Sequence, residues 1–242
     1  LREEKQRGAG SPRRLHSMGG IFALKVCVYA ICKNESQFVD RFMDSMSEAD
    51  YVCVLDTGST DDTVERLRSR GAVVGETVIA PWRFDTARNE SLRLIPADAD
   101  ICCAIDLDEQ FRPGWRAALE RAWQPDSTRA RYRYTWSFRP DGSEGMVFWA
   151  DKIHKNGCYR WKSPVHETLF YTGAGAERFV DAVGVQLDHH PDETKSRGQY
   201  LPLLELAVRE DPQDDRSCHY LGREYMYRGA WEKAVETLTR HL

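Results

Sequence analysis

Apolar and polar positions alternate in blocks along the first half of the chain. Between residues 25 and 123, short β-branched apolar runs are followed by segments whose apolar residues recur at helical spacing. The runs that predict strands cover residues 25–31, 51–56, 72–79 and 99–106, and the segments that predict helices cover residues 35–46, 60–71, 86–95 and 113–123. This alternation favours an α/β fold with a mostly parallel sheet that helices cover on both faces.

Single residues mark the ends of these predicted helices. Thr60 or Asp61 is suited to cap the N-terminus of the second helix, and Gly71 is suited to end it. Pro113 is expected in the first turn of the fourth helix, where its missing N–H costs no hydrogen bond. The boundaries therefore follow from local backbone chemistry.

The pattern changes after about residue 130. Residues 131–138 and 145–153 are rich in aromatic side chains and predict antiparallel or mixed strands. The last 50 or so residues change again, since Cys218, Leu221, Gly222 and Tyr225 follow the spacing of a tetratricopeptide repeat, with Cys in place of the first Trp. Residues 196–211 and 216–242 are expected to be helical parts of two successive repeats.

Composition narrows the class of protein. The 242 residues are 41% hydrophobic and 30% charged with a net charge of -4, which suits a globular protein and argues against nucleic-acid binding as its main task. The seven cysteines form no CxxC pair and mostly lie in apolar runs. They are expected to be reduced core residues, so we expect a cytoplasmic protein. No apolar run approaches the roughly 18 residues of a membrane span.

The strand predicted at residues 99–106 leads directly into three carboxylates. Asp106 and Asp108 lie on one side of an extended chain, about 7 Å apart, and Glu109 lies on the other. Two carboxylates on one side favour a hard cation such as Mg²⁺ or Mn²⁺, which typically bridges the phosphates of a nucleotide. A solvated turn after the strand is the alternative.

Polar residues also follow the first two predicted strands. Asn34 and Glu35 come after the first strand and Asp56 comes at the end of the second. In a parallel sheet, ligands bind beyond the carboxyl ends of the strands. Neither segment is a glycine-rich phosphate loop, and each taken alone is also compatible with an ordinary turn.

Taken together, these three strand ends and the segment Phe84–Ser91 resemble the family 2 glycosyltransferases of GT-A fold, a Rossmann-like architecture. The resemblance runs from residue 25 to about residue 190. With the basic, Gly/Ser/Pro-containing first residues and the repeat spacing of the last ones, we expect a weakly structured leader or tag (1–20), a GT-A domain (21–194) and tetratricopeptide-like helices (195–242). The resemblance also implies a set of residues that bind the nucleotide-sugar, with Asp56 at the uridine: Asn34, Glu35, Asp56, Arg88, Asn89 and Asp106.

The segment around His166 and Glu167 resembles the members of this family that carry tetratricopeptide repeats, including the peptide S-glycosyltransferases of bacteriocin pathways. The resemblance implies Glu167 as the base that accepts the acceptor's proton, with Asp151 behind it. A structural turn at His166 and Glu167 is the alternative.

The expected metal ligands are Asp106, Asp108 and a late histidine, since GT-A enzymes commonly complete the metal shell in that way. Adjacent residues of a strand point to opposite faces, so at most one of His189 and His190 is expected to bind the metal. A solvated loop at these two histidines is the alternative.

We therefore expect a metal-dependent, inverting glycosyltransferase that uses Mg²⁺ or Mn²⁺ and a nucleotide-sugar, most simply a UDP-sugar. The acceptor stays open among peptides, glycans and other molecules, as does a homodimer through the C-terminal helices. Two other classes are open: a scaffold whose GT-A domain has lost activity, and a sugar-phosphate nucleotidyltransferase. The latter should carry a glycine-rich basic loop after the first strand, and residues 32–36 contain none.

Overall fold

The computed structural model describes residues 24–192 and 198–240, so the expected leader at residues 1–20 lies outside the described residues. The strands are β1 (Val26–Cys32), β2 (Tyr51–Asp56), β3 (Val73–Glu76), β4 (Ile101–Ala104), β5 (Glu109–Phe111), β6 (Arg129–Thr135), β7 (Val147–Lys155), β8 (Tyr159–Lys162), β9 (Thr168–Tyr171) and β10 (Phe179–His189). The α-helices are α1 (Val39–Ser45), α2 (Thr63–Ser69), α3 (Phe84–Ser91), α4 (Trp115–Ala122), α5 (Tyr200–Glu210), α6 (Asp215–Tyr227) and α7 (Trp231–Arg240). Two short 3-10 helices, η1 (Ser36–Phe38) and η2 (Leu92–Leu94), adjoin α1 and α3.

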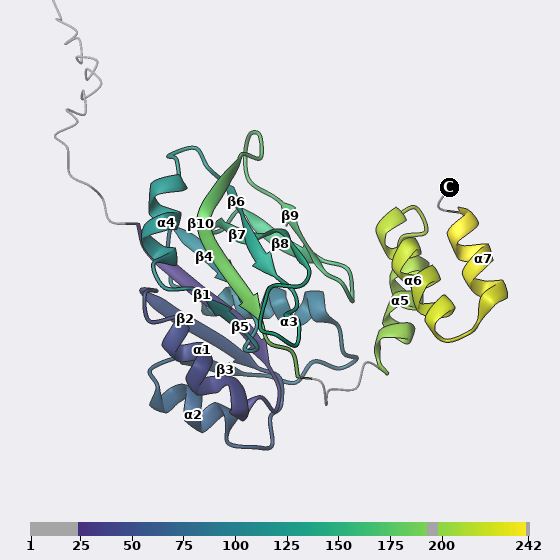
Figure 1. Cartoon of the computed structure of the whole chain (residues 1–242), viewed down its shortest axis with the longest axis horizontal. Coiled ribbons are helices and arrows are strands. Elements are labelled where there is room, and N and C mark those ends of the chain that lie inside the picture. Colours follow the sequence, from purple (N-terminus) through teal and green to yellow (C-terminus); the bar gives the residue numbers. More distant parts are fainter. Residues whose placement is uncertain (1–23, 193–197, 241–242) are drawn as a thin grey trace, which may run out of the picture.

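A mixed sheet of eight strands forms the body of the protein, in the order β3-β2-β1-β4-β7-β6-β10-β5 (Figure 1). The strands β3, β2, β1 and β4 pair in parallel, as the alternating pattern predicts. The pairs β4–β7, β6–β7 and β10–β5 are antiparallel, whereas β10 runs parallel to β6. The predicted α/β class is therefore confirmed, and the change of pattern after residue 130 marks the antiparallel part.

The central strand β1 is buried on both faces, which explains why its sequence is apolar throughout. Val26, Val28 and Ala30 face a core shared with α1 and α4, whereas Cys27 and Tyr29 face a second core shared with β8 and β9. Each face of the sheet thus has its own apolar layer. A strand covered on both sides cannot show alternation between apolar and polar residues.

Two predicted helix boundaries are wrong by one or two residues. Asp62, rather than Thr60 or Asp61, occupies the N-cap of α2, while the Asp61 carboxylate accepts hydrogen bonds from the Thr63 backbone N–H and hydroxyl. Pro113 precedes the α4 N-cap, which is Gly114 at a φ of 85°, a value that favours glycine. The predicted end of α2 at Gly71 is confirmed by its φ of 91°.

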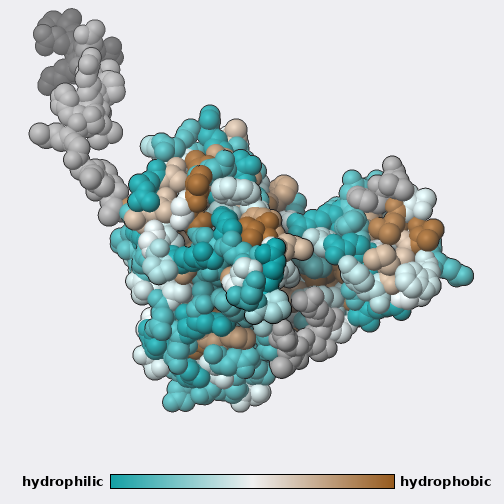
Figure 2. All heavy atoms as spheres, in the orientation of Figure 1, coloured by the Kyte–Doolittle hydropathy of each residue, from teal (hydrophilic) through white to brown (hydrophobic). Residues whose placement is uncertain are grey.

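The helices α5, α6 and α7 form a separate group beside the sheet (Figure 1). Gly222 of α6 allows close packing with α7, because a Cβ at this position would lie 2.5 Å from the Leu238 side chain. The helical character expected for the C-terminal segment is confirmed. Apolar side chains exposed on this group include Met226, Trp231 and Val235, and brown patches appear on its surface in Figure 2.

Six of the seven cysteines are buried and the seventh, Cys158, is half-buried. The seven are free thiols, as the sequence predicts for core residues. None of the helices in the described ranges is long and apolar enough to cross a membrane.

Candidate active site at the carboxyl ends of the strands

The sheet brings the predicted site residues to one edge. Because β4 and β6 each run antiparallel to β7, and β10 runs parallel to β6, the carboxyl ends of β1, β4 and β10 lie at the same side of the sheet. The carboxylates that follow β4 therefore meet His189, the last residue of β10. Residues separated by about 80 positions come together in this way.

Arg88 on α3 joins two of the predicted site residues. Its Nη2 donates to Asp106 Oδ1 at 2.5 Å, and its Nε donates to Glu167 Oε1 at 3.0 Å. The guanidinium lies above the ring of Trp161, 5.4 Å from its centroid. Arg88 is only 3% exposed, so two carboxylates compensate one deeply buried positive charge.

Lys152 on β7 completes this charge cluster, with its Nζ 3.6 Å from Asp106 Oδ2. Burial opposes ionisation of Asp106, but Arg88 and Lys152 outweigh it and hold the pKa of this carboxyl below its usual value. Burial also opposes the charge of Lys152, yet Glu109 and Asp106 raise the pKa of its ammonium group. Asp106, Arg88 and Lys152 therefore carry their charges at neutral pH.

Asp108 faces His189, whose orientation is set by a second contact. The His189 Nδ1 donates to the carbonyl of Trp136 at 3.1 Å, which leaves Nε2 directed at Asp108 Oδ2, 3.5 Å away. Burial lowers the pKa of His189, but Asp108 and the Trp136 carbonyl raise it to a net value above the usual one. The pair thus attracts a positive charge, whether a proton or a metal ion.

Both carboxylate oxygens of Glu109 accept hydrogen bonds. Its Oε1 accepts from the Tyr134 hydroxyl at 2.6 Å and its Oε2 accepts from the Asp106 backbone N–H at 2.8 Å. Burial raises the pKa of Glu109, which is 2% exposed. Each of the three carboxylates after β4 therefore has a hydrogen-bond or ion-pair partner of its own.

The polar residues at the ends of β1 and β2 form hydrogen bonds within and between the two loops that follow these strands. Asn34 Oδ1 accepts from the Thr60 N–H at 2.7 Å, and the Asn34 N–H donates to the Ser59 hydroxyl. Asp56 Oδ1 accepts from the N–H groups of Gly58 and Ser59, both at 2.9 Å. Asp56 is 2% exposed.

Glu35 lies in the same pair of loops. It is 7% exposed, and its backbone N–H donates to the Thr63 hydroxyl at 2.8 Å. For Asn34, Glu35 and Asp56 the contacts seen are those of two turns that hold each other. Their predicted contacts with a nucleotide stay a prediction.

Three other predicted site residues make contacts outside the charge cluster. The amide of Asn89 bonds both the N–H and the carbonyl of Trp161, at 3.0 and 2.9 Å, and so fixes the start of the segment that leads to Glu167. Asp151 pairs with Arg129 at 3.1 Å, and no hydrogen bond or ion pair in the described ranges joins it to Glu167. The ring of His190 stacks on Phe138, 5.2 Å between centroids.

The two histidines have different surroundings, and only His189 belongs to β10. His189 faces Asp108, whereas the His190 ring stacks on the hairpin between β6 and β7 and only its backbone N–H reaches Asp108, at the carbonyl, 2.8 Å away. Burial, together with Arg41, lowers the pKa of His190. Of the two, His189 is the one placed to bind a metal ion.

The donor set suits a cation that also takes ligands from a substrate. Within residues 24–192 and 198–240, no group of three or more His, Cys, Asp or Glu side chains is arranged to hold a metal ion. The Asp108 oxygen and the His189 nitrogen offer two ligands at a separation of 3.5 Å. Because Mg²⁺ and Mn²⁺ sites often draw their other ligands from phosphates and water, a two-residue site fits such an ion.

Two contributors to this site carry no signal in the sequence. Lys152 lies inside an aromatic-rich strand, and only the pairing of β7 with β4 places it beside Asp106. Trp136 acts through its backbone carbonyl, and its ring lies 4.6 Å from that of His189. Backbone contacts of this kind cannot be found from residue types.

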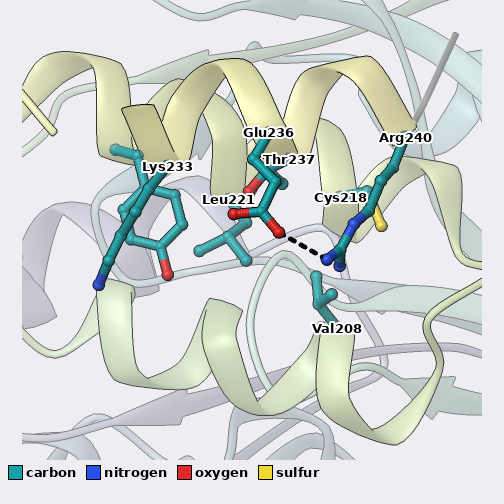
Figure 3. A pocket seen from close by; sticks show the side chains of 8 residues that line it. Val208, Cys218, Leu221, Lys233, Glu236, Thr237 and Arg240 are labelled. Carbon is teal, nitrogen blue, oxygen red and sulfur yellow. Dashed lines mark hydrogen bonds and ion pairs between the residues drawn. The ribbon is translucent and has the colours of Figure 1, made fainter. Parts of the chain in front are cut away.

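A hollow of about 210 Å³ lies between α5, α6 and α7 (Figure 3). It is lined by Val208, Cys218, Leu221, Lys233 and Thr237, with the ion pair of Glu236 and Arg240 at 2.8 Å on one side. It contains none of the predicted site residues.

Comparisons with known proteins give remote likenesses. No protein-family model matches the chain. A glucosyl-3-phosphoglycerate synthase from Mycobacterium tuberculosis, solved in complexes with Mn²⁺ or Mg²⁺ and UDP, is 23% identical with a TM-score of 0.37, and the match covers 46% of this chain and 44% of the synthase. A mycobacterial protein is 17% identical with a TM-score of 0.48, over 74% of this chain and 71% of its own. The chain spans less than half of the synthase, so its activity must be argued from its own residues.

Proposed function

We propose that the protein is a glycosyltransferase that moves a sugar from a nucleotide-sugar, with a UDP-sugar as the first candidate, to an acceptor. The observation that carries the proposal is the convergence at one sheet edge of the Asp106–Arg88–Glu167 bridge and the Asp108–His189 pair. The first group joins a candidate base to the carboxylates of the strand end, and the second offers a cation site. In sugar transfer from a nucleotide diphosphate sugar, a base can accept the acceptor's proton and a cation can stabilise the leaving diphosphate.

Asp108 and His189 would hold Mg²⁺ or Mn²⁺. When bound, the ion supplies positive charge for the diphosphate that leaves as the sugar–oxygen bond breaks. The Trp136 carbonyl keeps the His189 Nδ1 protonated and so leaves Nε2 free for a metal. Asp106 is also predicted as a metal ligand. Its ion pairs with Arg88 and Lys152 suit a different role, in which Asp106 does not bind the ion directly and orients these two side chains.

Glu167 is the proposed base. Its side chain is 12% exposed and is held by Arg88, which fixes one of its oxygens and leaves the other for an acceptor proton. As the acceptor atom bonds to the anomeric carbon, its proton passes to Glu167 and the nucleotide diphosphate leaves with the electron pair of the broken bond. Attack from the opposite side inverts the anomeric carbon. Asp151 pairs with Arg129 instead and is not supported as a second base.

The buried guanidinium of Arg88 retains capacity for a further ligand. Its Nη1 has no hydrogen-bond partner among the residues described, although the atom is buried. An unpaired buried N–H is costly, so a ligand oxygen or a water molecule is expected to complete it. This is consistent with the predicted role of Arg88 beside the donor.

The finer parts of the proposal concern the family, the acceptor and the helices. The strand-end pattern resembles hexosyltransferases of family 2, and the helix spacing resembles tetratricopeptide repeats of the peptide S-glycosyltransferases. A peptide acceptor and a homodimer through α5–α7 belong to the same proposal. The Mn²⁺, Mg²⁺ and UDP named for the synthase structures are therefore the first ligands to test.

The test is calorimetric titration of the full chain with UDP in the presence of Mn²⁺, Mg²⁺ or EDTA, followed by a hydrolysis screen with UDP-glucose and other UDP-sugars. The wild-type chain is expected to bind UDP more tightly with metal than in EDTA. In Asp108→Asn, the UDP affinity should be the same with metal and in EDTA. Asp181→Asn is the matched control, because this exposed acid on β10 pairs with Arg131. Equal UDP binding in EDTA by the wild-type chain would contradict the cation site.

A further inference from the structure

The C-terminal helices contact the segment that carries Glu167. Val165 shares an apolar cluster with Leu203 and Leu204 of α5 and Leu221 of α6. The ring of His166 stacks on that of Tyr220 of α6, with 4.0 Å between centroids and 18° between planes. Glu167 is the next residue along the chain, so α6 touches the immediate neighbour of the proposed base.

The backbone of this segment takes a conformation that its sequence does not favour. Ser163 has a φ of 80° and His166 a φ of 52°, both in the left-handed region that non-glycine residues rarely occupy. Such conformations persist only when surrounding contacts determine them. The stack on Tyr220, together with the ring of Tyr200 on α5 at 5.7 Å between centroids, holds the His166 ring while its backbone turns towards Glu167.

Further contacts join α5 to the start of α3, which itself bonds the segment. Phe84 donates its backbone N–H to the carbonyl of Pro164 at 3.0 Å, and its ring meets Tyr200 of α5 at 6.3 Å. Arg83 pairs with Glu210 of α5 at 2.5 Å. Arg83 and Phe84 begin α3, the helix that carries Arg88, so the helices brace both partners of the Arg88–Glu167 bond.

We propose that Tyr220 is a positioning residue for Glu167 that acts through the ring of His166. The inference rests on the proposed function of Glu167 as the base, and it gives the helical group a task at the transfer site itself. A base must lie within hydrogen-bond reach of the proton it accepts. Loss of the stack would let the His166 backbone relax and would move Glu167 away from that position.

The test compares Tyr220→Ala with Tyr220→Phe in hydrolysis of UDP-glucose with Mn²⁺, where water takes the place of the acceptor. Tyr220→Ala is expected to lower kcat roughly 10–100-fold, because a displacement near 1 Å can have such an effect. UDP affinity should stay unchanged, since Asp108 and His189 are not touched. Tyr220→Phe keeps the ring and should retain full activity.

Tyr227→Ala is the matched control. This tyrosine lies on the same helix, is 68% exposed and contacts Arg223 rather than His166. Its removal should leave hydrolysis as in the wild type. An equal loss in Tyr227→Ala and Tyr220→Ala would assign the effect to the helix in general and overturn the inference.

A double-mutant cycle separates positioning from a structural role. If Tyr220 acts through Glu167, Tyr220→Ala should cause no further loss in a Glu167→Gln chain, because the base is already absent. Independent losses that multiply would overturn the inference. Should Tyr220→Ala fail to fold, Tyr220→Leu keeps apolar volume without the ring and serves in the same cycle. Failure of the proposed function shows separately, as absent metal-dependent UDP binding and hydrolysis in the wild type.

Discussion

Two neighbouring parts of the sheet edge satisfy their buried acids in different ways. After β1 and β2, Asp56 and Asn34 bond backbone groups of the loops beside them. After β4, Asp106 and Asp108 bond side chains that come from α3 and β10. The first arrangement consists of turns that hold each other, whereas the second consists of ion pairs between elements that are far apart in sequence.

The difference indicates which acids shape the protein and which are available for chemistry. A carboxylate bonded by two or three backbone N–H groups cannot leave them without loss of the turn. A carboxylate paired with another side chain can exchange that partner for a ligand or a cation. Asp56 is therefore expected to affect folding more than Asp108 does, and Asp108 and Glu167 are expected to affect activity more.

The largest expected effect is on catalysis. Glu167→Gln should lower the kcat of UDP-sugar hydrolysis by roughly 10²–10⁴-fold with UDP affinity unchanged, because the amide keeps the shape but accepts no proton. Rate and calorimetry on the same samples measure the two quantities. Glu90→Gln, an exposed acid on α3 paired with Arg93, is the control. A near-normal kcat in Glu167→Gln would indicate that the His166–Glu167 segment is a structural turn and does not supply the base.

Arg88→Met should lower the free energy of unfolding by about 3–5 kcal/mol, because it leaves Asp106 and Glu167 without their shared buried cation. Urea denaturation measures this change. The control is Arg93→Met on the adjoining turn η2, where the side chain is 76% exposed, and a change below about 0.5 kcal/mol is expected. An equal loss of unfolding free energy in the two variants would show that the charge cluster stabilises the protein no more than a surface ion pair does.

Asp56→Ala should cost about 3 kcal/mol of stability, because the carboxylate accepts from the N–H groups of Gly58 and Ser59. Donor affinity should fall along with stability if the turns also border the nucleotide. Asp62→Ala is the comparison, since Asp62 occupies the α2 N-cap without a side-chain capping bond. A larger loss in Asp62→Ala than in Asp56→Ala would contradict the assignment of the turn to Asp56.

The smallest expected effect concerns the pH dependence of stability and involves His154, a buried histidine outside both regions. Burial lowers the pKa of His154 to about 4. Since the unfolded chain binds this proton near pH 6.5, stability is present above that pH and is lost as the pH falls towards 4. Between pH 7.5 and 5 the loss should be about 2 kcal/mol. His154→Gln, which can still bond Tyr29, should remove this loss, and an unchanged loss of stability at pH 5 would show that His154 does not cause it.

The strands of the first half, the end of α2 at Gly71 and the buried cysteines were predictable because each depends on neighbours in sequence. The residue types of the site were predictable for the same reason, since Asp106 and Asp108 directly follow an apolar run. The N-cap of α2 and the place of Pro113 were not, because several adjacent residues can serve in each position. The short strand β5 was missed because its acidic start, Glu109, is a poor strand former whose side chain Tyr134 satisfies.

The sequence by itself determined an α/β sheet, two strand-end loops, an acidic strand end and a helical C-terminal group, because those features follow from local spacing and local backbone chemistry. Only the tertiary structure decided which charge meets which partner. Arg88 reaches Asp106 and Glu167, 18 and 79 residues away, and the His166 ring meets Tyr220 on another group of helices. The physical reason is that partners of buried charges and rings are chosen by the path of the sheet and the docking of helices, which residue spacing does not specify.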